Sequence, residues 1–316
     1  MAFKSMNQQL RLKGILMSLG NLSFTEGRLR LLHRLSRGRK MPVKVDGIRY
    51  SEIQIPRPDG TKMRCLVFKP INKPQKSVPG VLWLHGGGYA LGFPEMGAEM
   101  AKRMMAISQC TVLAPDYRLS PEAPYPAAVE DAYLALCYLH HHAESYQVDQ
   151  HQIMVGGDSA GGGLTAALTL YARDKQEVPI AFQMPLYPML SDLPTPSSTH
   201  NTAPVWNSRS NEAAWKLYLG ELYGTDQVPA YAAPIRATHF SGLPPTATFV
   251  GSLEPFLDET LDYCQKLKAS GIPVDVKVYE GCYHAFEQMC PEARISKEAV
   301  GWIMERFAYA VKHYRT

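Results

Sequence analysis

The 316-residue sequence predicts an α/β fold, in which a mostly parallel central sheet carries helices on both faces. Two observations favour this fold class. From Val81 onward, short apolar runs alternate with longer helical stretches, and strand–helix alternation of this kind builds parallel sheets. The hydrophobic content of 46% is also sufficient for one sizeable core. A single α/β unit takes roughly 200–250 residues, which leaves room for an appended segment.

A β-hairpin is expected to precede the alternating region. Two alternating apolar runs, at 53–55 and 63–67, flank the turn signal Pro58-Asp59-Gly60, and this pattern favours two antiparallel strands. The remaining strands are expected at 81–84, 110–114, 153–155, 181–186, 246–250 and 274–279, and the helices at 96–108, 126–143, 160–174, 256–270 and 295–313.

Two segments do not follow this alternation. Residues 1–45 contain scattered apolar positions that suggest one or two helices. Residues 190–240 begin rich in Pro, Ser and Thr and then show a short helical stretch near 211–222. An insertion of this length between two strands is usually functional, often as a lid. We therefore expect an α/β-domain over 46–316, with residues 1–45 and the insertion 190–240 forming a two-part cap.

Charge is distributed unevenly along the chain. The net charge is +4, but residues 1–44 hold ten Lys or Arg and a single acid, Glu26, so they carry +9 and the remainder −5. Such a segment can meet anionic lipid, nucleic acid or acidic substrates, or form a solvated helical face. We favour the solvated face because no nucleic-acid-binding motif accompanies it.

The sequence offers no targeting or membrane signal. No run approaches the roughly 18 consecutive apolar residues that span a bilayer. The first residues also lack the apolar core of a signal peptide. We therefore expect a cytoplasmic protein with no nucleic-acid partner and no stable membrane insertion.

The motif Gly157-Asp158-Ser159-Ala160-Gly161 carries the strongest chemical signal. It fits G-x-S-x-G and lies between the apolar run 153–155 and the apolar stretch 164–171. In a strand-to-helix turn, this motif holds the serine in a strained backbone geometry and presents its hydroxyl at the positive end of a helix. Ser159 is therefore the predicted nucleophile.

The sequence His85-Gly86-Gly87-Gly88 follows the expected strand at 81–84. Three glycines let backbone amides point at one spot without obstruction by side chains. Together with the amide of Ala160, they can form an oxyanion hole for a tetrahedral intermediate. We expect His85 itself to be structural.

A serine nucleophile needs a base, and the base needs an orienting acid, in the chain order Ser, Asp or Glu, His. His284 is the predicted base because it lies in a short loop after the expected strand at 274–279. The acid should follow the strand at 246–250. Glu254 comes first on that loop, before a proline that can open the next helix. Asp258 is the reserve candidate, and Asp192 is a more remote one.

No metal, organic cofactor or disulfide is expected. The cluster His140-His141-His142 lacks ligand-like spacing, and we interpret it as surface. None of the six cysteines forms a CxxC pair, so they are expected to be reduced thiols.

With these residues assembled, the chain resembles the hormone-sensitive-lipase-like family of α/β-hydrolases, which includes bacterial acetyl esterases and arylacetamide deacetylase-like enzymes. The resemblance spans about 78–312. It rests on HGGG at 85–88, DYRLSPEAPYPAA at 116–128, GDSAGG at 157–162 and the acid and histidine loops.

This resemblance implies an α/β-hydrolase fold with a helical cap. It also implies oxyanion-hole amides from Gly87, Gly88 and Ala160, and a triad of Ser159, Glu254 and His284. One loop departs from the family pattern: the usual acid loop reads Asp-Pro-Leu-x-Asp-Glu, whereas this chain reads Glu-Pro-Phe-Leu-Asp-Glu. Because glutamate is one methylene longer than aspartate, the loop backbone must lie slightly farther from the imidazole for the carboxylate to make the same contact.

The expected activity is hydrolysis of short-chain carboxylic esters, acetyl esters in particular, with a small-molecule ester as the binding partner. An amidase or a carbohydrate-ester deacetylase shares this chemistry, so motifs do not separate them. A non-catalytic ligand-binding protein is disfavoured because a candidate for every catalytic role is present.

Trp206, Trp215 and Tyr218 would either limit the depth of the acyl pocket or form the core of the cap. Oligomeric state is left open, with a homodimer as one candidate.

Overall fold

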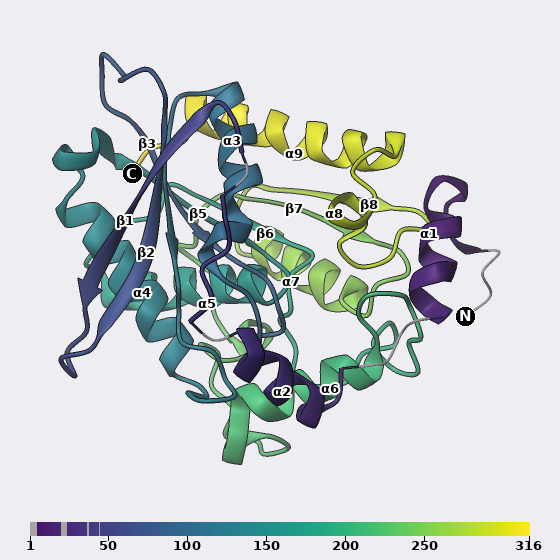
Figure 1. Cartoon of the computed structure of the whole chain (residues 1–316). Helices are drawn as coiled ribbons and strands as arrows, with labels where there is room; N and C mark the ends of the chain where they lie inside the picture. The colour runs from purple at the N-terminus through teal and green to yellow at the C-terminus, as the bar shows by residue number, and fades with distance from the viewer. Residues whose placement is uncertain (1–4, 20–23, 37, 44) are drawn as a thin grey trace.

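A computed structural model describes residues 5–19, 24–36, 38–43 and 45–316. Within these residues an eight-stranded sheet, ordered β1-β2-β4-β3-β5-β6-β7-β8, forms the centre of the molecule (Figure 1). The strands are β1 (Ile48–Pro56), β2 (Lys62–Pro70), β3 (Val78–Leu84), β4 (Thr111–Pro115), β5 (Val148–Asp158), β6 (Phe182–Leu186), β7 (Thr246–Gly251) and β8 (Val274–Tyr279).

The pairing of the strands confirms the predicted hairpin and the mostly parallel sheet. Strand β1 pairs antiparallel with β2, and β2 pairs antiparallel with β4. All pairs from β4 through β3 and on to β8 are parallel. Strands β3, β4, β6 and β7 are buried along their whole length, as expected for parallel strands covered on both faces.

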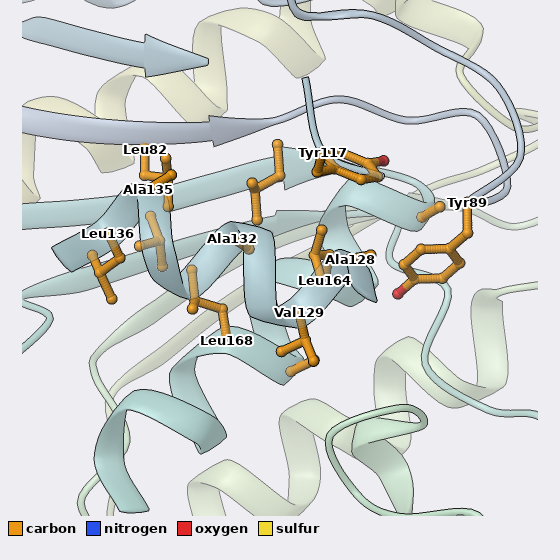
Figure 2. Packing of buried hydrophobic residues seen from close by; sticks show 14 of the residues in the cluster. Leu82, Tyr89, Tyr117, Ala128, Val129, Ala132, Ala135, Leu136, Leu164 and Leu168 are labelled. Atoms are coloured by element: carbon orange, nitrogen blue, oxygen red, sulfur yellow. The ribbon is translucent and has the colours of Figure 1, made fainter. Parts of the chain in front are cut away.

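Helices cover both faces of the sheet (Figure 1). Helices α3 (Ala98–Ile107) and α9 (Arg294–His313) lie on one face, and α4 (Ala127–His141), α5 (Ala160–Lys175) and α7 (Leu257–Ala269) lie on the other. All five begin and end within two residues of the predicted limits. Figure 2 shows the second face, where Leu82 of β3 meets α4 and α5. Small side chains on α4 allow close packing there: Ala128, Ala132 and Ala135.

Strand β5 starts five residues before the predicted run at 153–155. Its first part carries Asp149, Gln150 and His151, and these residues do not lie in the core. The apolar run therefore marked only part of the buried stretch, which continues to Asp158. Strand β5 pairs with β3 at Val148 and again from Ile153, with a register shift between them, so the polar residues 149–151 lie in an irregularity of the strand that hydrophobicity does not mark.

The remaining helices lie near the carboxyl ends of the parallel strands, in the two segments that break the alternation. Helix α1 (Gln8–Leu19) lies beside the loop after β8, and α2 (Glu26–Ser36) packs on α6 (Ser208–Leu219) of the 190–240 segment. The Asn207 side chain caps α6 by accepting from the Ser210 amide at 3.2 Å. The short elements are α8 (Phe286–Met289) and the 3₁₀ turns Pro94–Gly97, Glu144–Tyr146, Gly220–Leu222 and Pro234–Arg236. In the described parts of the chain, none of the helices has the length and apolar character needed to cross a bilayer.

Candidate active site

Ser159 occupies the sharp turn between β5 and α5. Its φ of +58° and ψ of −120° are strained for a residue with a Cβ. The packing of the flanking glycines explains why the chain turns here. A Cβ on Gly157 would lie 2.5 Å from the Leu84 carbonyl oxygen, and one on Gly161 would lie 2.1 Å from it. Only glycine at both positions lets the turn approach β3 this closely.

Three predicted residues meet at this turn. The Nε2 atom of His284 lies 2.9 Å from Ser159 Oγ, and its Nδ1 atom lies 2.5 Å from Glu254 Oε2. All three residues are buried, with exposed fractions of 6% for Ser159, 4% for His284 and 0% for Glu254. The second oxygen of Glu254 accepts from the amide of Gly251 at 2.7 Å, which fixes the carboxylate. An acid, an imidazole and a hydroxyl thus form one continuous chain of hydrogen bonds.

The two alternative acids have other partners. Asp258 lies on the first turn of α7, where its carboxylate accepts from the amide of Ser197 at 2.6 Å. Asp192 forms a two-point ion pair with Arg236, with both N···O distances at 2.7 Å. Of the three candidate carboxylates, Glu254 is therefore the one that geometry places on the imidazole.

The triglycine loop lies directly against the serine. A Cβ built on Gly86 would lie 3.2 Å from Ser159 Cβ. The next two glycines have left-handed φ values, +126° for Gly87 and +62° for Gly88, and their added Cβ atoms would strike the Leu91 carbonyl and the Trp206 ring. Within the described residues, no protein group accepts from the amides of Gly87, Gly88 or Ala160. These amides are therefore available to a ligand.

His85 is built into this loop, as the sequence predicted. Its ring stacks on Tyr117 with centroids 4.2 Å apart, and its Nδ1 atom lies 2.9 Å from the carbonyl oxygen of Gly86. Burial lowers the pKa of this histidine, which favours the neutral ring. The Tyr117 hydroxyl also donates to the His85 carbonyl at 2.7 Å, so this pair supports the loop.

Aromatic rings surround the imidazole of His284. Tyr187 and Phe256 meet it edge-on, each with a centroid distance of 5.1 Å, and Trp206 lies 6.3 Å away. The three aromatics predicted for the cap, Trp206, Trp215 and Tyr218, are all buried. Such surroundings exclude water and strengthen the electrostatic interactions of the charged groups inside.

A polar array behind the serine, in which an exposed glutamine bonds buried groups, was not predicted. Gln288 donates to Asp158 at 3.1 Å and to the Tyr187 hydroxyl at 2.9 Å, and that hydroxyl bonds Glu287 in turn. Burial raises the pKa of Asp158, and it raises that of Glu287 to about 8. The sequence showed only that Asp158 adjoins Ser159 and that Glu287 and Gln288 follow shortly after His284. No rule of sequence spacing predicts hydrogen bonds between these residues.

Two buried carboxyl groups predict an unusual dependence of stability on pH. Burial raises the pKa of Glu287 and of Glu259 to about 8, whereas both ionise near 4.5 when the chain unfolds. Between about 4.5 and 8 the folded state therefore holds protons that the unfolded state has released. The free energy of unfolding should fall as pH rises from 7 to 8, by roughly 1 kcal/mol per pH unit for each group.

Thermal melts followed by circular dichroism at these two pH values test this expectation. The window lies above the ordinary pKa of histidine, 6.5, so the buried neutral His85 does not mask the trend. Glu287→Gln removes one of the two groups and should flatten the dependence. A slope equal to that of the wild-type protein in both Glu287→Gln and Glu259→Gln would contradict the assignment.

Comparison with known proteins gives a consistent result. Esterase LipI of Mycobacterium tuberculosis (strain ATCC 25618 / H37Rv) is 33% identical over 267 residues, which cover 84% of this chain and 83% of that protein. Carboxylesterase NlhH of the same strain is 34% identical over 231 residues, or 71% and 72% of the two chains.

Solved structures agree with these sequence relatives. A bacterial heroin esterase superposes with a TM-score of 0.89 at 32% identity, over 98% of this chain and 99% of that one. Esterase LipW from Mycobacterium marinum gives a TM-score of 0.81 at 25% identity, over 98% and 97%. The family described as alpha/beta hydrolase fold matches residues 81–288. The chain therefore belongs to the α/β-hydrolase fold family, in its hormone-sensitive-lipase-like branch.

Proposed function

We propose that this chain is a serine carboxylesterase that hydrolyses short-chain esters, acetyl esters in particular, through an acyl-enzyme. The observation that carries the proposal is the hydrogen-bonded chain from Glu254 through His284 to Ser159, set against the triglycine loop. The relatives whose names are esterase or carboxylesterase support the same reaction class.

In the first half of the proposed reaction, Ser159 Oγ attacks the ester carbonyl carbon and His284 Nε2 takes its proton. The amides of Gly87, Gly88 and Ala160 stabilise the negative charge on the carbonyl oxygen. His284 then donates that proton to the leaving alcohol oxygen. Glu254 holds the imidazole by its Nδ1–H and stabilises the transient imidazolium.

In the second half, His284 takes a proton from water as the water attacks the acyl-enzyme. The imidazolium returns the proton to Ser159 Oγ as the carbon–oxygen bond breaks, and the carboxylic acid leaves. No step requires a metal or an organic cofactor.

A two-part cap, formed by residues 1–45 and 190–240, is part of the proposal. The amide of Phe24 donates to Ser210 Oγ at 3.0 Å, and the Phe24 ring lies 5.8 Å from that of Trp206. Trp206 in turn contacts the triglycine loop at Gly88. These contacts support a division into this cap and an α/β-domain over 46–316.

The preference for short acyl chains rests on the aromatic cluster beside the triglycine loop. Tyr89 and Tyr218 stack with centroids 3.8 Å apart, and Trp215 packs against both rings. All three are 1% exposed. A buried, stacked cluster beside the triglycine loop would leave little depth for a long acyl chain.

A panel of p-nitrophenyl esters, from acetyl to dodecanoyl, tests the function and its chain-length preference. We expect kcat/KM to be greatest for acetyl or butyryl and to fall at least about tenfold by octanoyl, because each methylene that does not fit forfeits binding energy. A maximum at long chains would refute the short-chain assignment.

Two further substrates separate the related activities. Faster turnover of p-nitroacetanilide than of the acetyl ester would favour an amidase. Release of acetate from acetylated xylan at a higher kcat/KM would favour a carbohydrate-ester deacetylase. If the folded protein binds these esters but turns over none, it is a ligand-binding protein. A cytoplasmic location and a homodimer remain predictions from the sequence.

A further inference from the structure

Large apolar side chains are unusually exposed on the N-terminal helices. Fourteen large apolar side chains are exposed among the described residues, and six of them precede residue 45. On α1 and α2 the exposed fractions range from 40% to 74%. The six residues are Leu12, Leu16, Leu31, Leu32, Leu35 and Met41.

These side chains are not on the faces by which the helices pack onto the protein. Helix α1 is anchored by buried Leu10, by Gly14 against the Tyr283 ring, and by the amide of Asn7, which donates to the Gly281 carbonyl at 2.8 Å. Helix α2 is anchored by buried Leu29 and His33. The exposed leucines form second apolar faces that cover nothing in the described structure.

The charge of this segment indicates what could cover them. Residues 1–44 carry +9, whereas the rest of the chain carries −5. Arg34 on α2 and Arg39, three residues after α2, are exposed, whereas Lys13 and Lys40 pair with Glu292 and Glu52. Exposed leucines combined with clustered cations are typical of helices that lie in the interface of an anionic bilayer.

Two other occupants fit this surface less well. A second copy related by a two-fold axis would bring the same exposed cations against themselves. Nucleic acid would use the cations, but it would leave the leucines in water. An anionic bilayer matches both features, because its charged headgroups can pair with the cations and its apolar interior can take up the leucines.

The position of the two helices makes such docking relevant to the site. Helix α1 contacts Gly281, three residues before His284. Helix α2 lies on α6 (Figure 1). Phe24, two residues before α2, contacts Trp206, whose ring lies 6.3 Å from that of His284. The two helices therefore approach the histidine loop from two sides.

We propose that the exposed faces of α1 and α2, here called the docking surface, bind an anionic phospholipid bilayer peripherally, without crossing it. Leucines enter the headgroup region, and the surrounding Lys and Arg meet lipid phosphates. Docking would hold the histidine loop beside the membrane surface. This inference concerns binding alone and does not depend on the proposed esterase activity.

Co-sedimentation with vesicles tests the docking surface. We expect the full chain to bind vesicles of phosphatidylcholine and phosphatidylglycerol (about 3:1) at least tenfold more tightly than vesicles of phosphatidylcholine alone. Binding should weaken when NaCl rises from about 0.1 to 0.5 M, because salt screens exposed charges. Equal binding to both vesicle types, or no binding to either, would overturn the proposal.

Paired substitutions separate the apolar contribution from the charge. Leu12→Gln/Leu16→Gln and Leu31→Gln/Leu35→Gln keep good helix formers in place and should each weaken vesicle binding about tenfold. The matched control Ile71→Gln/Leu261→Gln changes two exposed apolar residues outside the segment and should bind like the wild-type protein. Melting curves confirm that each variant is folded.

Size-exclusion chromatography of the same variants covers the remaining outcomes. If the leucine variants dissociate a dimer while vesicle binding is unchanged, the surface joins two copies and the lipid proposal is wrong. Tighter binding to a DNA duplex than to anionic vesicles, unaffected by the leucine changes, would also refute it.

Discussion

Replacing Ser159 with alanine is expected to lower kcat for p-nitrophenyl acetate by at least about 10⁴-fold while the protein stays folded. The hydroxyl lies 2.9 Å from His284 Nε2, and alanine leaves no atom that can form the acyl-enzyme. Alanine retains the Cβ, so the turn with φ of +58° carries the same strain as before. Any residual rate would come from the amides and from substrate binding.

Two measurements make this result decisive. Diethyl p-nitrophenyl phosphate should add a diethylphosphoryl group to the peptide that contains Ser159 in the wild-type protein, and mass spectrometry should find no adduct in Ser159→Ala. The control Ser241→Ala changes an exposed serine and should keep full activity. If Ser159→Ala turns over the ester within tenfold of the wild-type rate, the nucleophile lies elsewhere.

Replacing Glu254 with glutamine is expected to lower kcat by about 10³–10⁴-fold with little change in KM. The carboxylate accepts the Nδ1–H of His284 at 2.5 Å and so keeps Nε2 free to take the serine proton. An amide can present its NH₂ group to Nδ1 instead, which favours the tautomer with a protonated Nε2. That tautomer cannot act as the base for Ser159.

Asp258→Asn is the matched control for this substitution. Its carboxylate bonds the Ser197 amide rather than the imidazole, so the change should cost less than about tenfold in kcat. Glu254→Asp restores the charge with a shorter side chain and should recover part of the lost rate. If Asp258→Asn is more damaging than Glu254→Gln in folded proteins, Asp258 rather than Glu254 orients the histidine.

The agreement between sequence and fold has a local origin. Apolar runs of five or six residues predicted β4, β6 and β7 to within one residue at each end, because burial on both faces requires such runs. The helices after β4 and β7 lie within two residues of their predicted limits, whereas α6, after β6, begins and ends three residues before the predicted stretch 211–222. The limits of β5 were less well predicted, since residues 149–151 near its start are polar and lie outside the core. Pairing of Val148 with β3, on the far side of a register shift, extends the strand where side-chain hydrophobicity does not.

By itself, the sequence determined the order of strands and helices and located the serine turn, the triglycine loop and the histidine loop. Those features depend on short runs of residues adjacent in the chain, such as Gly157-Asp158-Ser159-Ala160-Gly161 after an apolar run. Only the tertiary structure decided which of the three candidate acids touches the imidazole, and that Asp158, Gln288, Tyr187 and Glu287 form one hydrogen-bonded array. These contacts join residues 30 to 130 positions apart. Hydrogen bonds depend on distances of a few tenths of an ångström, which packing sets and sequence spacing does not.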